Sequence, residues 1–318
     1  MTKTEMNQKI KNILGQANTI CLFFLLNSDN GLIMKRANIE NGATTTELEH
    51  MFKSRLLQMA EDEDLTIISL SNADERANAI YEYDYDEYPE DMRFIQSFNL
   101  DEALKCENFS FSKDNLQSLA GYLIYIGNMS EGITCFKKHY NISVIKRDAF
   151  LLGKSNELFK KLDTDEIIRL NNEIHVFKLQ NNIFVINIKV LEDSFGFDTL
   201  IRKRADETMK DIESLNLIEN IDKLEESSKD IAFSRKLSKL AGQSLIINKA
   251  IPNEKVIDFS KENPGLKDKF KYSADGKKIV LSSKSSQKYF IKLLNDDFLM
   301  SELTEQPYDS LAKDKITV

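Results

Sequence analysis

Lysines near the C-terminal end of the chain carry the most suggestive chemistry in this sequence. Ten lysines and four acidic residues lie between Lys255 and Lys292. Lys284, Lys288 and Lys292 recur at every fourth position, which places their ammonium groups along one side of a helix. Lysine neutralises nucleic-acid phosphates without reading the bases. The segment therefore predicts DNA binding that is independent of base sequence, with a solubilising helix face as the alternative interpretation.

Further basic residues could extend such a surface. The candidates are Lys277, Lys278, Arg235, Lys236, Lys239, Arg202, Lys203 and Arg204. No acidic residue occurs from Ile231 to Gly242, so the cluster that begins at Arg235 is not neutralised within its own helix. Asp206 and Glu207 follow the cluster at residues 202–204 by one turn, so a salt-bridged solvent face is the favoured interpretation of that cluster.

A metal-dependent nuclease is a different possibility. Such enzymes often place one acidic residue and an acid-x-Lys motif on a β-hairpin, where the carboxylates bind Mg²⁺ and the lysine orients the attacking water. Glu173 precedes a predicted hairpin, and the segment Asn-Ile-Lys at residues 187–189 ends it. Asn187 stands where a carboxylate is needed, and a neutral amide lacks the charge that binds a hard cation. We therefore do not expect an intact nuclease site here.

No other catalytic or metal-binding pattern stands out. His50, His139 and His175 are isolated, and His175 lies in an apolar strand, which is typical of a core histidine. The three cysteines are far apart and predict neither disulfides nor a zinc site. The glycines form neither a Walker loop nor a dinucleotide-binding motif. We expect no catalytic residues, no metal and no cofactor.

The net charge of −8 is distributed unevenly over the 318 residues. Residues 1–112 carry 10 basic and 20 acidic groups, whereas residues 231–318 carry 16 and 11. Exposed charges are screened over about 8 Å in physiological salt, so the local balance decides what a polyanion meets. The longest apolar run, Ile20–Leu26, is far shorter than the roughly 20 residues of a membrane span. We therefore expect a cytoplasmic protein with an acidic N-terminal part and a basic C-terminal part.

The acidic, tyrosine-rich segment 81–91 is the counterpart of the basic end. Its alternating tyrosines are typical of a strand with one aromatic face. A solvated edge strand, protected by charge from aggregation, is the favoured interpretation. The alternative is a partner-binding patch formed by Tyr83, Tyr85 and Asp86, because tyrosine is enriched at protein interfaces.

Apolar periodicity predicts an α+β fold: mixed sheets with a central β-hairpin, flanking helices and a helix-rich C-terminal part. The hairpin joins residues 174–179 to 183–188 through Gln180-Asn181-Asn182, where asparagine tolerates positive φ. Thr44 or Thr45 is expected to cap the second helix. Expected helices cover residues 4–14, 45–60, 199–215, 228–241, 253–261 and 285–298; expected strands cover 19–26, 32–37, 65–70, 122–126, 142–146 and 244–248.

A loop-like stretch that ends near Asn115 suggests a division of the chain. We expect an acidic N-terminal α/β region over residues 1–114. A C-terminal α+β region with a basic tail is expected over residues 115–318.

Two segments resemble the KwaB family of the Kiwa anti-phage defence system. The block from Lys288 to Asp314 is similar to the closing motif of that family, and residues 150–204 are similar to its central part. The matching positions of the closing block are Asp296, Asp297, Ser301, Leu303, Thr304, Tyr308, Lys313 and Asp314.

The resemblance implies a cytosolic DNA-binding protein that self-associates, as a homodimer, and works with a membrane-embedded partner, KwaA, which would recruit it to the inner membrane. It implies no settled catalytic residues. From the residues themselves, Asn295-Asp296-Asp297 is a helix-terminating turn rather than a metal site. Two alternatives stay open: a metal-dependent nuclease with a divergent site at Asp296, Asp297 or Glu173, and a protein-interaction adaptor whose lysines form only a solvated surface.

Overall fold

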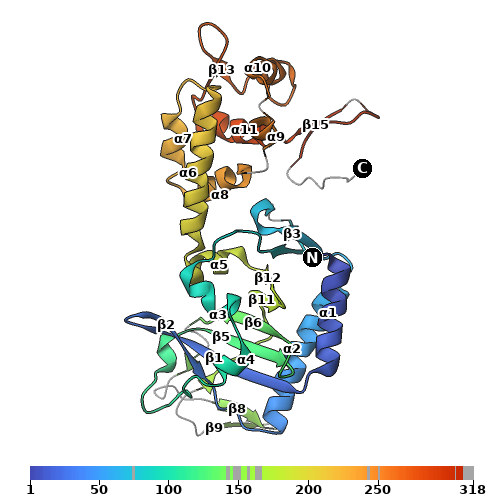
Figure 1. The fold of residues 1–318 in the computed structure, drawn as a ribbon, viewed down its shortest axis with the longest axis vertical. Helices are drawn as coiled ribbons and strands as arrows, with labels where there is room; N and C mark the ends of the chain where they lie inside the picture. Colours follow the sequence, from blue (N-terminus) through green and yellow to red (C-terminus); the bar gives the residue numbers. More distant parts are fainter. Residues whose placement is uncertain are drawn as a thin grey trace. The chain divides into compact units, whose positions relative to one another are not determined.

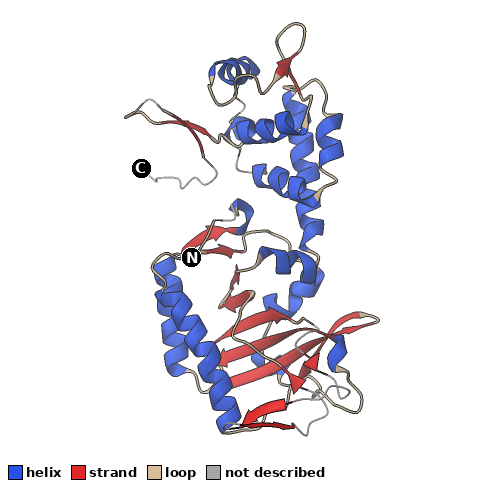
Figure 2. Cartoon of the chain, turned by 180° about the vertical axis from the view of Figure 1, so that it is seen from behind, coloured by secondary structure: helices blue, strands red, loops and turns tan. Residues whose placement is uncertain are grey.

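The computed structural model describes residues 1–73, 76–140, 144–145, 152–155, 158–161, 167–241, 244–249, 251–304 and 306–310. The chain divides into two compact units (Figure 1). The sheet unit combines Met1–Leu70 with Asn78–Gly196, and the helical unit combines Ser71–Ala77 with Phe197–Val318. Helices and strands are both abundant (Figure 2), which confirms the predicted α+β class.

An eight-stranded sheet, in the order β2-β1-β5-β6-β11-β12-β4-β3, is the centre of the sheet unit. Neighbouring strands are antiparallel except β3 and β4, which are parallel. The strands are β1 (Thr19–Ser28), β2 (Gly31–Arg36), β3 (Thr66–Ser69), β4 (Ala79–Glu82), β5 (Leu119–Gly127), β6 (Gly132–Lys138), β11 (Val176–Leu179) and β12 (Asn182–Val185). The strands expected over 19–26, 32–37, 65–70 and 122–126 are thereby confirmed.

Two long helices, α1 (Lys3–Gln16) and α2 (Ala43–Glu61), pack against each other and supply apolar side chains to the core of the sheet unit. Met6 and Ile10 of α1 and Phe52 and Leu56 of α2 are almost completely buried. Their spacing of four residues puts each couple on one helix face. Because burial of such a side chain contributes roughly 1.5–3 kcal/mol, these faces hold both helices in the unit.

The two helices begin differently. In α1 the Thr2 hydroxyl accepts a hydrogen bond from the Glu5 amide (3.2 Å), and the Glu5 carboxylate accepts one from the Thr2 amide (2.8 Å). The threonine cap predicted for α2 is wrong, because Gly42 occupies the N-cap position with φ 100°. That φ lies in the region that glycine tolerates best. The hydroxyls of Thr45 and Thr46 instead donate to the Gly42 carbonyl.

The predicted central hairpin is confirmed as β11 and β12. Leu179 pairs with Asn182, so Gln180 and Asn181 form the turn. The positive φ of this turn (55°) belongs to Gln180 and not, as expected, to an asparagine.

The sheet contains strands from both sides of residue 114, because β1 pairs with β5 along its whole apolar run. The two compact units divide between Gly196 and Phe197 instead. Gly196 has φ 68° and forms the left-handed C-cap of α5 (Ile188–Phe195), which ends that helix. The structural division therefore differs from the expected regions 1–114 and 115–318.

Shorter elements complete this part of the chain. They are η1 (Leu70–Asn72), η2 (Glu90–Met92), α3 (Arg93–Gln96), α4 (Leu100–Ala103) and η3 (Leu116–Ser118), with two small strand pairs, β7 (Val144–Ile145) with β10 (Ile167–Ile168) and β8 (Leu152–Ser155) with β9 (Leu158–Lys161). Of the strand expected over 142–146, only residues 144–145 lie within the described residues, where they form β7.

The helical unit contains α6 (Phe197–Leu215), α7 (Asp222–Ser227), α8 (Ile231–Leu240), α9 (Leu245–Asn248), α10 (Asn253–Glu262) and α11 (Lys284–Leu294), with the hairpins β13 (Lys271–Tyr272) to β14 (Ile279–Val280) and β15 (Phe298–Met300) to β16 (Pro307–Asp309). Asp230 caps α8 by accepting from the Phe233 amide (3.1 Å), so the helix expected from 228 begins later. The strand expected over 244–248 is wrong: Ser244 caps the short helix α9 instead.

Helix α11 ends four residues earlier than expected. Asp296 adopts φ 59°, its amide donates to the Leu293 carbonyl (3.0 Å), and the Asp297 amide donates to the Lys292 carbonyl (3.0 Å). Residues 295–297 therefore form the predicted helix-terminating turn. Among the described helices, none is long and apolar enough to cross a bilayer.

Candidate nucleic-acid interface

Helix α11 presents two sharply different faces. Phe290, Ile291, Leu293 and Leu294 are buried in the core of the helical unit. Ser283 starts the helix with a capping box in which its hydroxyl accepts from the Ser286 amide (3.1 Å). The buried face fixes the orientation of the helix, so that the opposite face turns to solvent.

The solvent-facing side of α11 carries the predicted lysine stripe. Lys284 and Lys288 are exposed, and Lys292 is half-buried. The Lys292 Nζ lies 6.0 Å from the centroid of the Tyr289 ring. With a rise of 1.5 Å per residue, the stripe extends over about 12 Å. One DNA strand carries a phosphate about every 3.4 Å along the axis, so this length matches three to four phosphates.

Two hydrogen bonds, one partly buried and one buried, hold α11 to the segments beside it. The Ser227 hydroxyl, at the end of α7, donates to the Gln287 side-chain oxygen (2.6 Å). The Ser244 hydroxyl, fully buried, donates to the Leu294 carbonyl at the end of α11 (2.6 Å). A buried hydrogen bond of this kind fixes position because breaking it leaves polar groups without a partner. The lysine stripe therefore sits on a rigidly anchored helix.

The hairpin β13–β14 presents Lys277 and Lys278 near its turn. The Asp275 carboxylate accepts hydrogen bonds from the Ser273 hydroxyl (2.6 Å) and the Lys277 amide (3.1 Å), which lower the pKa of Asp275. This carboxylate closes the turn and does not pair with a lysine ammonium. Lys277 is exposed, and the Lys278 ammonium donates to the Asn216 side chain (2.6 Å).

Most lysines of the segment 255–292 keep an uncompensated charge. Within the described residues, nine of them form no ion pair: Lys255, Lys261, Lys267, Lys269, Lys271, Lys277, Lys278, Lys284 and Lys288. The alternative in which each charge is matched by a neighbouring carboxylate does not hold for these nine. Their positive charge is available to an external polyanion.

Aromatic rings hold some of these lysines in place, which the sequence analysis did not predict. The Lys269 Nζ lies 5.2 Å from the centroid of the Tyr289 ring, and the Lys261 Nζ lies 5.0 Å from that of Tyr272. A cation over a ring face is attracted but keeps its charge. Tyr289 and Lys292 are three residues apart on α11, which is the spacing of neighbours on one helix face. No local sequence pattern links Lys269 to Tyr289, because they come from different segments of the chain.

The cluster on α8 lies on a neighbouring helix, because α8 packs against α11. Lys236 is exposed, and Arg235 and Lys239 are half-buried with further contacts. The cluster on α6 consists of Arg202, Lys203 and Arg204. The Arg202 guanidinium donates to the Lys229 carbonyl (3.1 Å). Arg202 therefore joins α6 to the turn between α7 and α8.

The residues of the nuclease alternative have structural partners. The Glu173 carboxylate bonds the Lys137 ammonium (2.5 Å), which lowers the pKa of Glu173. Asn187 caps α5 by accepting from the Val190 amide (3.1 Å). Asp297 is buried and accepts from the Asn295 amide group (2.7 Å). No group of three potential metal ligands occurs among the described residues.

The isolated histidine in the hairpin is a core residue, as predicted. His175 is buried, and its Nδ1 accepts from the Lys138 backbone amide (3.1 Å). Burial, assisted by the nearby Lys137 charge, lowers the pKa of His175 to about 4. The imidazole is therefore neutral near pH 7 and serves as a hydrogen-bond acceptor.

The tyrosine-rich segment differs from both interpretations of its sequence. Tyr83 and Tyr85 are buried, and the Tyr83 ring stacks on Tyr88 with 4.6 Å between centroids. Strand β4 pairs on both sides, with β12 and with β3, so it is not an edge strand. The predicted partner-binding patch is therefore wrong for Tyr83 and Tyr85, because their rings are buried in the fold. Asp86 is exposed.

The family-motif residues beyond α11 lie on the β15–β16 hairpin. Leu299 pairs with Tyr308, and the Thr304 amide donates to the Ser301 hydroxyl in the turn (3.2 Å). Leu303 is 94% exposed, and Tyr308 is also exposed. Asp296 and Asp297 form the preceding turn. Lys313 and Asp314 lie outside the described residues.

Comparison with known proteins agrees with the resemblance of these segments. A family model described as Kiwa protein KwaB-like matches residues 116–304. The chain is 29% identical over 319 residues to the Kiwa protein KwaB of Escherichia coli O55:H7 (strain RM12579 / EPEC), with 99% of both chains covered. No solved structure matches it. The chain belongs to the KwaB-like family of Kiwa proteins, which are components of anti-phage defence.

Proposed function

We propose that this chain is the DNA-binding component of a Kiwa defence system. The lysine stripe of α11 contacts the phosphate backbone, and the hairpin β13–β14 and helix α8 extend the contact. The observation that carries the proposal is the set of lysines in the segment 255–292 that form no ion pair within the described residues. When such lysines neutralise phosphates, DNA releases its bound counterions, and this release increases the binding affinity.

The chemistry of the stripe favours binding without base specificity. Lysine is a compact, flexible point charge, whereas bidentate base contacts in the major groove are made most often by arginine. Lys284 and Lys288 lie at the exposed face of an anchored helix, where they reach phosphates. The proposal therefore includes no sequence preference. It also includes no catalytic step, because partners within the fold already engage the carboxylates of Glu173 and Asp297.

Self-association is a further part of the proposal. Four large apolar side chains of the β15–β16 hairpin and its turn are exposed: Leu299, Met300, Leu303 and Tyr308. Exposed apolar groups that are contiguous on one element often mark an interface. A second copy of this chain would cover them and form a homodimer.

The proposal of a membrane partner is supported by membership of the KwaB-like family. We propose that the chain acts in the cytoplasm and is recruited to the inner membrane by the membrane protein KwaA. Within the described residues no helix can itself span a bilayer.

The DNA-binding proposal is tested with the double variant Lys284→Glu/Lys288→Glu. Both side chains are exposed, so the substitutions leave the core intact. The matched control, Lys105→Glu/Lys113→Glu, makes the same charge change at exposed lysines of the sheet unit. Fluorescence anisotropy with a 30-base-pair duplex should show about a tenfold or greater loss of affinity for the first variant and a much smaller loss for the control.

Three outcomes would contradict the proposal. Equal effects of the two variants would mean that only net charge matters and that α11 is not the contact. A protein that fails to bind DNA even at low salt would favour the adaptor interpretation. Nicking of plasmid DNA with Mg²⁺ or Mn²⁺ would instead favour the nuclease.

A further inference from the structure

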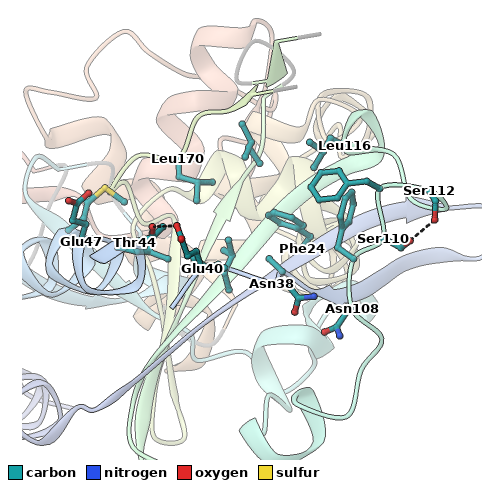
Figure 3. Close-up of a pocket in the computed structure, with 18 residues that line it drawn as sticks. Phe24, Asn38, Glu40, Thr44, Glu47, Asn108, Ser110, Ser112, Leu116 and Leu170 are labelled. Atoms are coloured by element: carbon teal, nitrogen blue, oxygen red, sulfur yellow. Dashed lines mark hydrogen bonds between the residues drawn. The ribbon is translucent and has the colours of Figure 1, made fainter. Parts of the chain in front are cut away.

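The sheet unit contains a large apolar hollow beside α2, shown in Figure 3. Its volume is about 990 Å³, at the upper end of the range typical of ligand-binding pockets. Leu22 and Phe24 of β1, with Leu116 and Leu170, form part of its apolar lining, and Leu48 and Met51 of α2 form another part. We call this feature the α2 hollow.

One wall of the α2 hollow is a row of three aromatic rings. Phe24 meets Phe109 edge to face, with 5.4 Å between centroids, and Phe109 meets Phe111 in the same way at 5.2 Å. Phe24 and Phe109 are buried, but Phe111 is 82% exposed. The row thus continues the apolar core outward and ends in a phenyl ring that water surrounds. An exposed aromatic ring at the rim of an apolar hollow is typical of an interaction site.

The mouth of the α2 hollow is acidic. Glu40 and Glu47 line it, both are exposed, and neither forms an ion pair within the described residues. The Thr44 hydroxyl donates a long hydrogen bond to the Glu40 carboxylate (3.4 Å; Figure 3), which leaves its negative charge in place. Among the described residues that line the hollow, none is a lysine or an arginine.

The side-chain amides of Asn38 and Asn108 also line the α2 hollow (Figure 3). An amide side chain both donates and accepts hydrogen bonds, so it can engage the backbone of a peptide. Ser110 and Ser112 hydrogen-bond each other beside them, with 2.9 Å between the hydroxyl oxygens. Polar groups of this kind around an apolar interior resemble the polar rim and apolar core of a protein interface.

We propose that the α2 hollow docks a segment of a partner protein in which bulky apolar side chains adjoin a lysine or an arginine. The apolar side chains fill the interior and cover Phe111, while the cation meets Glu40 and Glu47. Opposite charges across an interface steer association and exclude partners of the wrong sign. Glu40 and Glu47 form no ion pair within the described residues, so their negative charge disfavours fatty acids and anionic lipids as occupants. The proposal concerns the sheet unit and does not rest on DNA binding by α11.

The test is a selection of displayed random dodecapeptides on the full-length protein, followed by anisotropy measurements with the enriched peptides as labelled synthetic probes. Two variants change the site: Phe111→Ser removes the exposed ring, and Glu40→Lys/Glu47→Lys reverses the charge of the mouth. Their controls are Met129→Ser, an exposed apolar residue outside the hollow, and Glu213→Lys/Glu219→Lys, the same charge change in the helical unit. Circular dichroism confirms that each variant is folded.

The expected result is enrichment of peptides with bulky apolar and basic residues side by side. Their affinity should fall about tenfold or more with Phe111→Ser and with the charge reversal, and change less than twofold with the two controls. Enrichment of acidic peptides, failure to enrich any peptide, or binding that the site variants leave unchanged would each overturn the proposal. Loss of DNA binding in the α11 variants has no bearing on these results, so the two proposals can fail separately.

Discussion

The ammonium group of Lys269 lies over the ring of Tyr289 on α11, with 5.2 Å between Nζ and the ring centroid. The ammonium group of Lys292 lies 6.0 Å from the same centroid. One ring therefore restrains two lysines that come from different elements of the helical unit. The ring attracts the ammonium groups without neutralising them, so the two side chains have less freedom to lose on binding.

This arrangement predicts a moderate effect of Tyr289→Leu. The substitution keeps an apolar side chain of similar burial but removes the ring face, which is worth about 0.5–1 kcal/mol. Affinity for a DNA duplex at 0.1 M salt should fall about two- to fivefold. The dependence of affinity on salt should stay the same, because no charge is lost. Tyr88→Leu, in the sheet unit, is the control and should leave affinity unchanged. Equal losses in the two variants would refute this role of the ring.

The anchor of α11 predicts a stability effect at Ser244. Ser244→Ala leaves the buried Leu294 carbonyl without its donor, which costs about 1–2 kcal/mol of unfolding free energy. Urea denaturation followed by circular dichroism measures this loss. The control Ser285→Ala, at an exposed position of α11, should leave the unfolding free energy nearly unchanged. If Ser244→Ala unfolds at the same urea concentration as wild type, the hydrogen bond does not anchor α11.

The low pKa of His175 predicts a loss of stability in acid. In the folded protein the pKa is about 4, below the ordinary value of 6.5, so the unfolded chain binds a proton between these pH values and the folded chain does not. The stability that His175 contributes is complete above pH 6.5 and is lost as the pH falls towards 4.

The measurement compares unfolding free energies of wild type and His175→Asn at pH 7 and pH 4.5. The asparagine oxygen can replace Nδ1 as acceptor of the Lys138 amide but does not titrate, so the variant should lose less stability on acidification. The control variant His50→Asn, at an exposed position, should lose as much unfolding free energy on acidification as wild type. If His175→Asn loses as much unfolding free energy between pH 7 and pH 4.5 as wild type, another group causes the acid sensitivity.

The exposed β15–β16 hairpin predicts that Leu303→Ser/Tyr308→Ser weakens self-association. Both side chains are exposed, so the substitutions should leave the fold unchanged while removing apolar contact area. Sedimentation velocity over a range of protein concentrations should show a shift from dimer towards monomer. Phe111→Ser, in the sheet unit, is the control and should leave the dimer intact. A dimer that persists in the hairpin variant would locate the interface elsewhere.

The sequence predicts those features that depend on local periodicity. The apolar run of β1 and the spacing of Phe290, Leu293 and Leu294 identify a strand and a helix face, because burial of one face requires a fixed repeat. The lysines at 284 and 288 were predicted on the exposed side for the same reason, and the structure confirms their exposure.

Features that depend on contacts across the fold could not be predicted in this way. The alternating tyrosines at 81, 83 and 85 fit a strand with a solvated face, but β3 and β12 enclose β4 on both sides and Tyr83 and Tyr85 are buried. Residues 244–248 have the apolar, β-branched composition of a strand. The Ser244 cap and its bond to Leu294 nevertheless stabilise one helical turn there.

The boundary between the two compact units lies elsewhere than the expected division near residue 115, for a related reason. The loop-like stretch before Asn115 has the composition of a linker. The pairing of β1 with β5 joins two apolar strands that are far apart in sequence, and no local pattern predicts it. The α2 hollow likewise draws on segments far apart in sequence, including Phe24, Phe111 and Leu170. No single segment contains enough of its lining to predict it.

The dependence of DNA affinity on salt tests the central claim most directly. Logarithmic plots of affinity against NaCl concentration, from 50 to 200 mM as a typical range, give a slope of about −0.9 for each phosphate neutralised. For wild type we predict a steep slope, and for Lys284→Glu/Lys288→Glu a slope shallower by about 2, one for each lysine removed from a phosphate. An identical slope in the two proteins, or a wild-type affinity that salt does not change, would contradict phosphate binding by α11.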